Sequence, residues 1–125
     1  MNKLKNPITA PRRAVLPVKE TVIVKSILEY LQLRYKGRAF FWRNNSGALK
    51  TEKSFVRFGA TGSPDILGVL GPSGRLVGLE VKGAKGKTSE HQEAWLKEAQ
   101  ELGAVVGVVR SMDEACALIE GALHG

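Results

Sequence analysis

The chain has 125 residues, of which 43% are hydrophobic and 25% are charged. This length suffices for one domain that buries its own core without disulfides or a structural metal. The single cysteine, Cys116, excludes a disulfide framework and favours a cytosolic compartment. No apolar run is long enough to cross a bilayer, and the N-terminal stretch lacks the apolar segment of a secretory signal.

The net charge of +7 is unevenly spread along the chain. Residues 1–57 hold 13 Lys and Arg against 3 Asp and Glu, whereas residues 58–125 hold 6 against 9, so the two halves carry +10 and −3. A basic half on a small domain favours a polyanionic partner, most often nucleic acid. The alternative is a basic surface that is simply solvated.

The first elements in chain order are an arm and a helix. Residues 1–17 contain three prolines and four basic side chains, which predicts a flexible basic arm, with one domain over residues 18–125. The apolar spacing over residues 19–36 predicts a helix, and Gly37 can end it. Glu20 falls on the apolar stripe of that helix, and a buried glutamate needs a partner.

Three strands are expected next. Residues 38–43 read as a buried strand, residues 44–54 as a polar loop, and residues 55–64, less clearly, as a short strand followed by a Gly-rich turn. Residues 66–70 and 75–82 read as two strands of a hairpin around a Gly-Pro-Ser-Gly turn.

The last elements alternate helix, strand and helix. Thr88 or Ser89 can cap a helix that runs through Leu102, and its inward-facing residues are expected to be Trp95, Leu96, Ala99 and Leu102. A buried strand over residues 104–109 and a final helix capped by Ser111 and Glu114 follow. The predicted fold is therefore α/β in the order αβββαβα, with a mixed sheet because the strand at 104–109 is reached by a crossover.

The hairpin brings charged residues together at its open end. A symmetric four-residue loop pairs Leu70 with Arg75, and the same register places Asp65 opposite Glu80. Residues that are directly opposed share a face of the sheet, with Cβ atoms roughly 5 Å apart. Lys82 lies two residues beyond Glu80 and therefore points to the same side.

Two carboxylates held this close repel each other unless a cation lies between them. Oxygen ligands of this kind suit Mg²⁺, which can polarise a phosphoryl oxygen and lower the pKa of a bound water. Lys82 can help to orient that water or offset charge on the phosphate. The pattern indicates a metal-dependent phosphodiesterase site, and the alternative is a solvated hairpin end with a Glu–Lys surface pair.

The motifs "SPD" at 63–65 and "EVK" at 80–82 resemble the two halves of the PD-(D/E)XK nuclease motif. Over about residues 18–118 the chain is more closely similar to the VRR-NUC family of that superfamily. The stretches that carry this likeness are "WRNNSG" (42–47), "RFGATGSPDILGV" (57–69), "GLEVKGAKGKTSEHQ" (78–92) and "GVVRSMDEA" (107–115). The resemblance implies a restriction-endonuclease-like core, with a central mixed sheet flanked by helices, that hydrolyses DNA.

The resemblance also implies roles for particular residues. Mg²⁺ or Mn²⁺ would be held by Asp65 and Glu80, with the Val81 carbonyl as a third ligand, and Lys82 would be the catalytic lysine. Glu20 would be the acidic residue of the first helix, which binds metal directly or through water. The alternative for Glu20 is a carboxylate that is favoured near a helix N-terminus.

Gln92 matches a glutamine of the family motif at the start of the second helix. Its alternative is structural, because Ser89-x-x-Gln92 is also a capping box. The segment Gly86-Lys87-Thr88 is similar to the end of a phosphate-binding P-loop, but Val81 stands where that pattern needs glycine.

Basic and polar residues near the motifs are expected to contact DNA phosphates, with a solvated loop as the alternative. They are Arg43, Asn44, Lys50, Lys53, Arg57, Lys85 and Lys87. The two tryptophans, Trp42 and Trp95, are expected in the core rather than as base-stacking surfaces.

The sequence thus predicts a Mg²⁺- or Mn²⁺-dependent endodeoxyribonuclease that acts as a homodimer on branched DNA such as a four-way junction. The alternatives are a non-catalytic DNA-binding module with the nuclease fold, and a monomeric flap or nicking nuclease. A compact nuclease of this type suits the cytoplasm of a bacterium or of a phage-infected cell.

Overall fold

The computed structural model describes residues 19–45, 47–50 and 52–124. The predicted basic arm at residues 1–17 lies outside this part of the chain. None of the helices in the described part combines the length and apolar character needed to cross a membrane.

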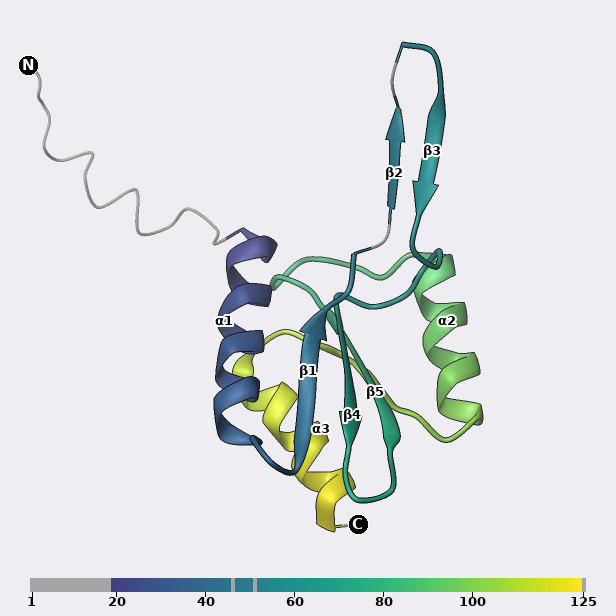
Figure 1. The fold of residues 1–125 in the computed structure, drawn as a ribbon. Coiled ribbons are helices and arrows are strands. Elements are labelled where there is room, and N and C mark those ends of the chain that lie inside the picture. The colour runs from purple at the N-terminus through teal and green to yellow at the C-terminus, as the bar shows by residue number, and fades with distance from the viewer. Residues whose placement is uncertain (1–18, 46, 51, 125) are drawn as a thin grey trace, which may run out of the picture.

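Figure 1 shows helices packed on the two sides of a central sheet, with a separate hairpin that stands away from the body. The elements in chain order are α1 (Glu20–Arg34), β1 (Ala39–Arg43), β2 (Gly47–Lys50), β3 (Phe55–Phe58), β4 (Ile66–Leu70), β5 (Arg75–Val81), α2 (Glu90–Glu101), β6 (Val105–Val109) and α3 (Met112–His124).

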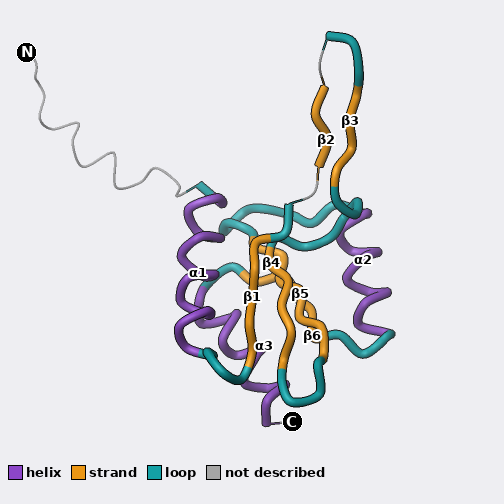
Figure 2. The backbone as a smooth tube through the Cα atoms, viewed as in Figure 1, coloured by secondary structure: helices purple, strands orange, loops and turns teal. Residues whose placement is uncertain are grey.

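The central sheet has four strands in the order β1-β4-β5-β6. β1, β4 and β5 pair antiparallel, whereas β6 pairs parallel to β5, because α2 forms the crossover between them. Helices α1 and α3 cover one face of the sheet, and α2 lies on the other (Figures 1 and 2). The prediction of an α/β fold with a mixed sheet flanked by helices is confirmed.

The main core lies between the sheet and the α1–α3 layer. The apolar period of α1 buries one stripe of the helix against alternate residues of the strands. The most buried members are Val24, Ile27, Leu31, Tyr35, Ile66, Val77, Leu79, Val81, Ala115 and Ile119. The Tyr35 hydroxyl, at the end of α1, donates a hydrogen bond of 2.7 Å to the Glu120 carboxylate of α3, which ties the two helices together.

The prediction of a polar loop over residues 44–54 is wrong, because β2 occupies 47–50. It pairs antiparallel with β3 from Gly47↔Phe58 to Lys50↔Phe55. This ladder is made by backbone groups, and a polar composition gives little indication of it. The resulting β2–β3 hairpin is a separate two-stranded sheet. It lies between β1 and β4 in the sequence, whereas these two strands are neighbours in the central sheet.

Several predictions of burial are also wrong. The strand predicted as buried over residues 38–43 forms β1, in which Phe41 alone is buried. Leu102 is 82% exposed, because α2 ends at Glu101 and Leu102 lines an open surface cavity. Trp42 is 39% exposed, because no helix lies on its side of β1 in the described part of the chain. Trp95 is half-buried and packs close to Gly78 of β5, so α2 covers the inner strands of this face.

Candidate active site

The open end of the β4–β5 hairpin gathers the predicted carboxylates. The observed register pairs Leu70 with Arg75 and Ile66 with Leu79, as predicted, so Asp65 and Glu80 are the next residues along the two strands. One oxygen of the Asp65 carboxylate accepts a hydrogen bond of 2.8 Å from the Val81 backbone N–H. Asp65 is therefore fixed against β5 beside Glu80.

Glu80 is a buried carboxylate with two side-chain donors. Glu80 as a whole is 3% exposed. Its Oε2 accepts a hydrogen bond of 2.9 Å from the Gln92 amide and lies 3.2 Å from the Lys82 Nζ. The Lys82 side chain is itself only 12% exposed, so this ion pair is largely removed from water. Glu80, Lys82 and Gln92 thus meet at one carboxylate oxygen.

The surroundings of Glu80 act against its ionisation. Burial first, and then the charge of the neighbouring Asp65, raises the pKa of Glu80 to about 7, while Lys82 opposes the shift. A carboxyl group that is kept partly protonated by a second carboxylate needs an additional positive charge to ionise fully. The carboxylate oxygens of Asp65 and Glu80 are therefore suitable ligands for a divalent cation.

Glu20 lies beside this site, but not where its sequence position suggested. It is exposed rather than buried on the apolar stripe, because the first turn of α1 extends past the sheet. Its Oε2 accepts a hydrogen bond of 3.2 Å from the Gly83 N–H. Within residues 19–45, 47–50 and 52–124, no three His, Cys, Asp or Glu side chains gather as a metal-binding group. Glu20 therefore contacts the loop after β5 rather than joining the carboxylate pair.

The loop after β5 passes close to both Glu20 and Lys82. A Cβ atom added at Gly86 would lie 2.9 Å from the Glu20 Oε2 and 3.3 Å from the Lys82 Cδ. A larger residue at this position would push the end of the flexible Glu20 side chain aside, so glycine lets the loop lie close to both side chains.

Gln92 completes the predicted capping box and also contacts Glu80. Its Oε1 accepts a hydrogen bond of 2.9 Å from the Ser89 N–H, and the Ser89 hydroxyl accepts one of 3.2 Å from the Gln92 N–H, which completes the capping box. Its Nε2 is then directed at Glu80. The helix cap holds the amide that contacts the carboxylate.

Asn44 has a role that sequence reasoning missed. Its side-chain amide donates hydrogen bonds of 2.8 Å to the Ser63 hydroxyl and to the Pro64 carbonyl. Its backbone N–H donates a further bond of 2.8 Å to the Asp65 carbonyl. Asn44 therefore holds the turn that presents Asp65, and this amide faces the protein rather than a DNA phosphate. About 20 residues of intervening chain hide this contact from local sequence patterns.

The same turn packs on the start of α2. Gly62 has a φ of +82°, which favours glycine, and an added Cβ would overlap the carbonyl of His91. Backbone contact at this point brings Asp65 and Gln92 to the same end of the sheet.

Arg110, at the end of β6, was also not predicted. Its guanidinium donates a hydrogen bond to the Gly83 carbonyl, and its backbone N–H donates one of 2.8 Å to Glu114 of α3. It connects the β6–α3 turn to the loop that carries Lys85 and Lys87. The only signal in the sequence is a lone arginine at a strand end, which is not specific.

The remaining predicted DNA contacts are partly described. Arg43, Lys53, Lys85 and Lys87 are exposed. Lys50 and Arg57 belong to β2 and β3, and their side chains lie outside what the structure describes. Lys85 and Lys87 follow the site in the loop before α2, whereas Lys53 belongs to the β2–β3 hairpin.

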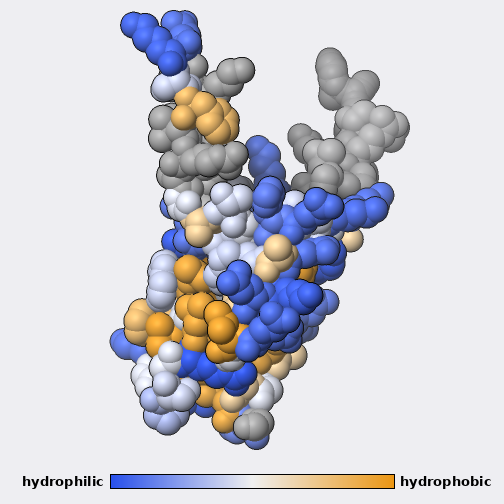
Figure 3. All heavy atoms as spheres, turned by 90° about the vertical axis from the view of Figure 1, so that its right-hand side faces the viewer, coloured by the Kyte–Doolittle hydropathy of each residue, from blue (hydrophilic) through white to orange (hydrophobic). Residues whose placement is uncertain are grey.

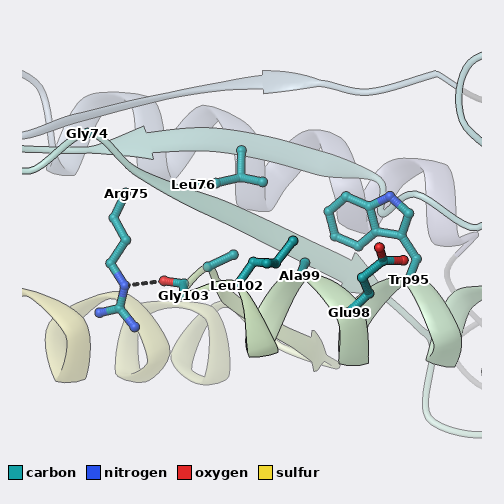
Figure 4. A pocket seen from close by; sticks show the side chains of 9 residues that line it. Gly74, Arg75, Leu76, Trp95, Glu98, Ala99, Leu102 and Gly103 are labelled. Carbon is teal, nitrogen blue, oxygen red and sulfur yellow. Dashed lines mark hydrogen bonds between the residues drawn. The ribbon is translucent and has the colours of Figure 1, made fainter.

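A surface cavity lies away from the carboxylates. It has a volume of about 520 Å³ and lies between α2 and the beginning of β5 (Figure 4). The residues that line it are Gly74, Arg75, Leu76, Trp95, Glu98, Ala99, Leu102, Gly103 and Ala104. Glu80 stands at the opposite end of β5, so this cavity and the carboxylate site are separate.

Comparison with known proteins identifies the family and the fold. The VRR-NUC domain family matches residues 25–113. A solved structure described as a VRR_NUC domain is 28% identical and has a TM-score of 0.53, with 77% of this chain and 92% of that chain covered. No curated protein matches this chain. Because the family match spans most of the chain, the protein belongs to the VRR-NUC domain family, whose members are nuclease-type DNA-binding domains.

Proposed function

We propose that this protein is a divalent-metal-dependent endonuclease that hydrolyses phosphodiester bonds of DNA. The observation that carries the proposal is the buried carboxylate of Glu80, 3% exposed, held beside Asp65 with Lys82 and Gln92 in contact. Burying two like charges together is unfavourable for a structure without a ligand. Such a cluster is typical of a functional site.

Asp65, Glu80 and the Val81 carbonyl would hold Mg²⁺ or Mn²⁺, and Glu20, the first residue of α1, would assist from its place beside the loop after β5. The raised pKa of Glu80 supports this assignment, since a cation would relieve the repulsion that raises it. When bound, the ion supplies Lewis-acid polarisation of the phosphate and a lower pKa for a water molecule.

The protein side chains have distinct tasks in this proposal. Lys82 offsets charge on the phosphate or orients the attacking water, because its ammonium group lies 3.2 Å from Glu80 in a largely buried position. Gln92 fixes the orientation of Glu80 through its hydrogen bond. Asn44 keeps the Asp65 turn in place. Preorganised groups of this kind lose little energy to rearrangement during reaction.

Exposed basic residues flank the site on two sides. Lys85 and Lys87 lie in the loop after β5, Arg43 ends β1, and Lys53 belongs to the β2–β3 hairpin. Contacts from these residues to phosphates would position a DNA strand without reading its sequence.

We infer further that the enzyme acts as a homodimer on branched DNA. One site cuts one strand, and two-fold pairing is the commonest way to supply a second site. Leu76 and Leu102, which are 37% and 82% exposed, form an apolar surface around the cavity at the end of the sheet remote from the carboxylates. A second copy on this surface would leave both sites open to a four-way junction.

The test is a cleavage panel with Mg²⁺, Mn²⁺ or EDTA on duplex, flap, fork and junction DNA. Asp65→Ala and Glu80→Ala should abolish cutting while DNA binding survives or tightens, because each removes negative charge beside the phosphates. Glu98→Ala, which removes a carboxylate beside the remote cavity, is the matched control and should cut normally. Near-normal cutting by either site variant contradicts the assignment, and wild-type binding without any metal-dependent cutting favours a non-catalytic module.

A further inference from the structure

Two aromatic side chains stand exposed on the outermost strand of the central sheet. Phe40 and Trp42 of β1 are 62% and 39% exposed. Their ring centroids lie 5.6 Å apart with an angle of 31° between the planes, so the two rings form one continuous surface. Large apolar groups in water are unfavourable, and an exposed patch of them is typical of a binding surface.

The strand register places this surface on the same face as the catalytic carboxylates. Trp42 pairs with Leu67, and Leu67 pairs with Gly78, so all three share a face. A Cβ added at Gly78 would lie 3.2 Å from the Trp95 ring, which identifies this face as the one under α2. Glu80, two residues beyond Gly78 and bonded to α2, lies on that face as well.

Along β1, the residues on this face approach the carboxylate site. Two residues beyond Trp42 is Asn44, whose backbone bonds to the Asp65 carbonyl. A two-residue step along a strand is roughly 6.6 Å. Trp42 is therefore about one such step from the position beside Asp65, and Phe40 is one step further away.

No described helix covers this part of the face. Phe41, between the two rings in sequence, is buried on the other side of the sheet, with its ring centroid 6.4 Å from that of Tyr35. Figure 3 views the side of the molecule that carries α2 and shows apolar surface exposed between hydrophilic regions. The rings of Phe40 and Trp42 are thus available to a ligand that approaches the carboxylates along β1.

We propose that Phe40 and Trp42 are a stacking surface for unpaired bases that lie next to the scissile phosphate. The inference rests on the proposed nuclease function and narrows its substrate to DNA with unpaired nucleotides beside the cut. Every base has a π-face that stacks on aromatic rings, whereas bases inside a duplex are already stacked on one another.

Two observations favour bases over a second protein chain at this position. A protein partner on Trp42 would cover the approach to Asp65 along β1, whereas a DNA strand must pass there to be cut. The half of the chain that contains β1 also carries +10, which suits a polyanion. A base inserted between two rings needs them about 7 Å apart, twice the stacking distance of about 3.4 Å. At 5.6 Å the pair has no such space, so bases would stack on its outer surface.

The experiment measures binding without cutting, in EDTA, with the full-length protein. The probes are a fluorescent duplex with a short single-stranded tail and the same duplex with blunt ends. Trp42→Ala should weaken binding of the tailed probe by roughly 5- to 150-fold, the effect of losing one stacked base, and change blunt-duplex binding by less than about twofold. Trp42→Phe should retain most of the affinity. Leu33→Ala, which removes an exposed apolar side chain (79% exposed) on α1, is the control and should change neither probe.

Tryptophan fluorescence gives a second measurement that a purely structural role would not alter. Quenching by the tailed probe should disappear in Trp42→Phe and persist in Trp95→Phe. Equal loss of affinity for both probes, or no loss for either, overturns the proposal. A change in mass by light scattering in Trp42→Ala, with unchanged affinity for the tailed probe, also overturns it and assigns the rings to a second copy of the chain.

The two proposals can fail separately. Binding in EDTA tests the stacking surface even if the protein cuts nothing. Conversely, a metal-dependent nuclease whose Trp42→Ala variant binds and cuts tailed DNA normally retains the proposed function and loses only the stacking surface.

Discussion

The two ends of the sheet face under α2 are built in opposite ways. At one end, Asp65 and Glu80 are crowded together among hydrogen-bond donors, and Glu80 is almost removed from solvent. At the other end, Leu76 and Leu102 stand exposed around a cavity of about 520 Å³. This cavity and the crowded carboxylates are thus at different places, and chemistry is expected where the charges are crowded.

The two ends also differ in what they contribute to stability. A buried pair of carboxylates lowers the stability of the metal-free protein, because burial and repulsion both act against ionisation. The cavity end leaves apolar surface in water and involves no buried charge. Substitutions at the first end should therefore alter catalysis and pH dependence, whereas substitutions at the second should alter association.

After the two carboxylates, whose removal should abolish cutting, the largest effect is expected from Lys82→Ala at the carboxylate end. The cleavage rate should fall by about 10²- to 10³-fold, since the lost charge acts on the transition state. Metal affinity measured by calorimetry should be largely kept. Lys97→Ala, on the exposed side of α2, is the control. Loss of metal binding together with disturbed folding would instead make Lys82 a structural partner of Glu80.

The second effect is on stability against pH. The pKa of Glu80 is about 7 in the folded protein, against an ordinary value of 4.5 for the unfolded chain. Between pH 4.5 and pH 7 the folded protein therefore binds a proton that the unfolded chain has released. Its stabilising contribution is full below pH 4.5 and is lost as the pH rises through 7. Relative to Glu80→Gln, the wild type in EDTA should lose about 3 kcal/mol of unfolding free energy over this range.

Urea denaturation of both proteins at pH 4.5 and pH 7.5 checks this difference. Parallel pH profiles for wild type and Glu80→Gln would mean that the carboxyl group ionises normally. Addition of Mg²⁺ at pH 7.5 should then restore stability to the wild type more than to the variant, because a ligand that binds only the folded state stabilises it.

A third, smaller effect separates the two contacts of Gln92. Gln92→Glu keeps a side chain that can complete the capping box but removes the donor to Glu80. Metal affinity should fall by roughly 10- to 100-fold, as for other residues that orient a ligand. Helix content measured by circular dichroism should be unchanged. If metal affinity is also unchanged, Gln92 serves the helix cap alone.

The smallest effect on chemistry is expected at the cavity end. Leu102→Lys should leave the nicking rate per site within about twofold and the unfolding free energy within about 0.5 kcal/mol. Light scattering should report a mass near twice 13.6 kDa for the wild type and near 13.6 kDa for the variant. A wild-type protein that is already monomeric would contradict the dimer and leave the nuclease proposal intact.

The sequence could predict those features of the site that depend on local geometry, namely the hairpin register and the helix cap. A symmetric turn fixes the register of β4 and β5, and the two-residue period of a strand then places Asp65, Glu80 and Lys82 on one side. The capping box at Ser89 and Gln92 is likewise a pattern of adjacent residues. These features were predictable because each depends on few residues that are close along the chain.

The features that sequence reasoning missed depend on distant segments or on which surfaces remain uncovered. Asn44 contacts a turn about 20 residues away, and its residue type alone does not indicate this. The helical period of α1 placed Glu20 on an apolar stripe, but it cannot show that the first turn extends beyond the sheet. Trp42 is exposed because α2 covers only part of its face of the sheet, and Leu102 because it follows the end of α2. Both are properties of the tertiary packing.

The β2–β3 hairpin enters and leaves the body at residues that are already joined, since Asn44 donates to the Asp65 carbonyl on the adjacent strand. Its length is therefore independent of the positions of Asp65 and Glu80. Doubling the length of a flexible insert adds only about 0.6 kcal/mol of closure entropy, so the fold tolerates a longer or shorter segment here. Evolution, or a protein engineer, can exchange this segment as a unit and leave the geometry around Glu80 unchanged.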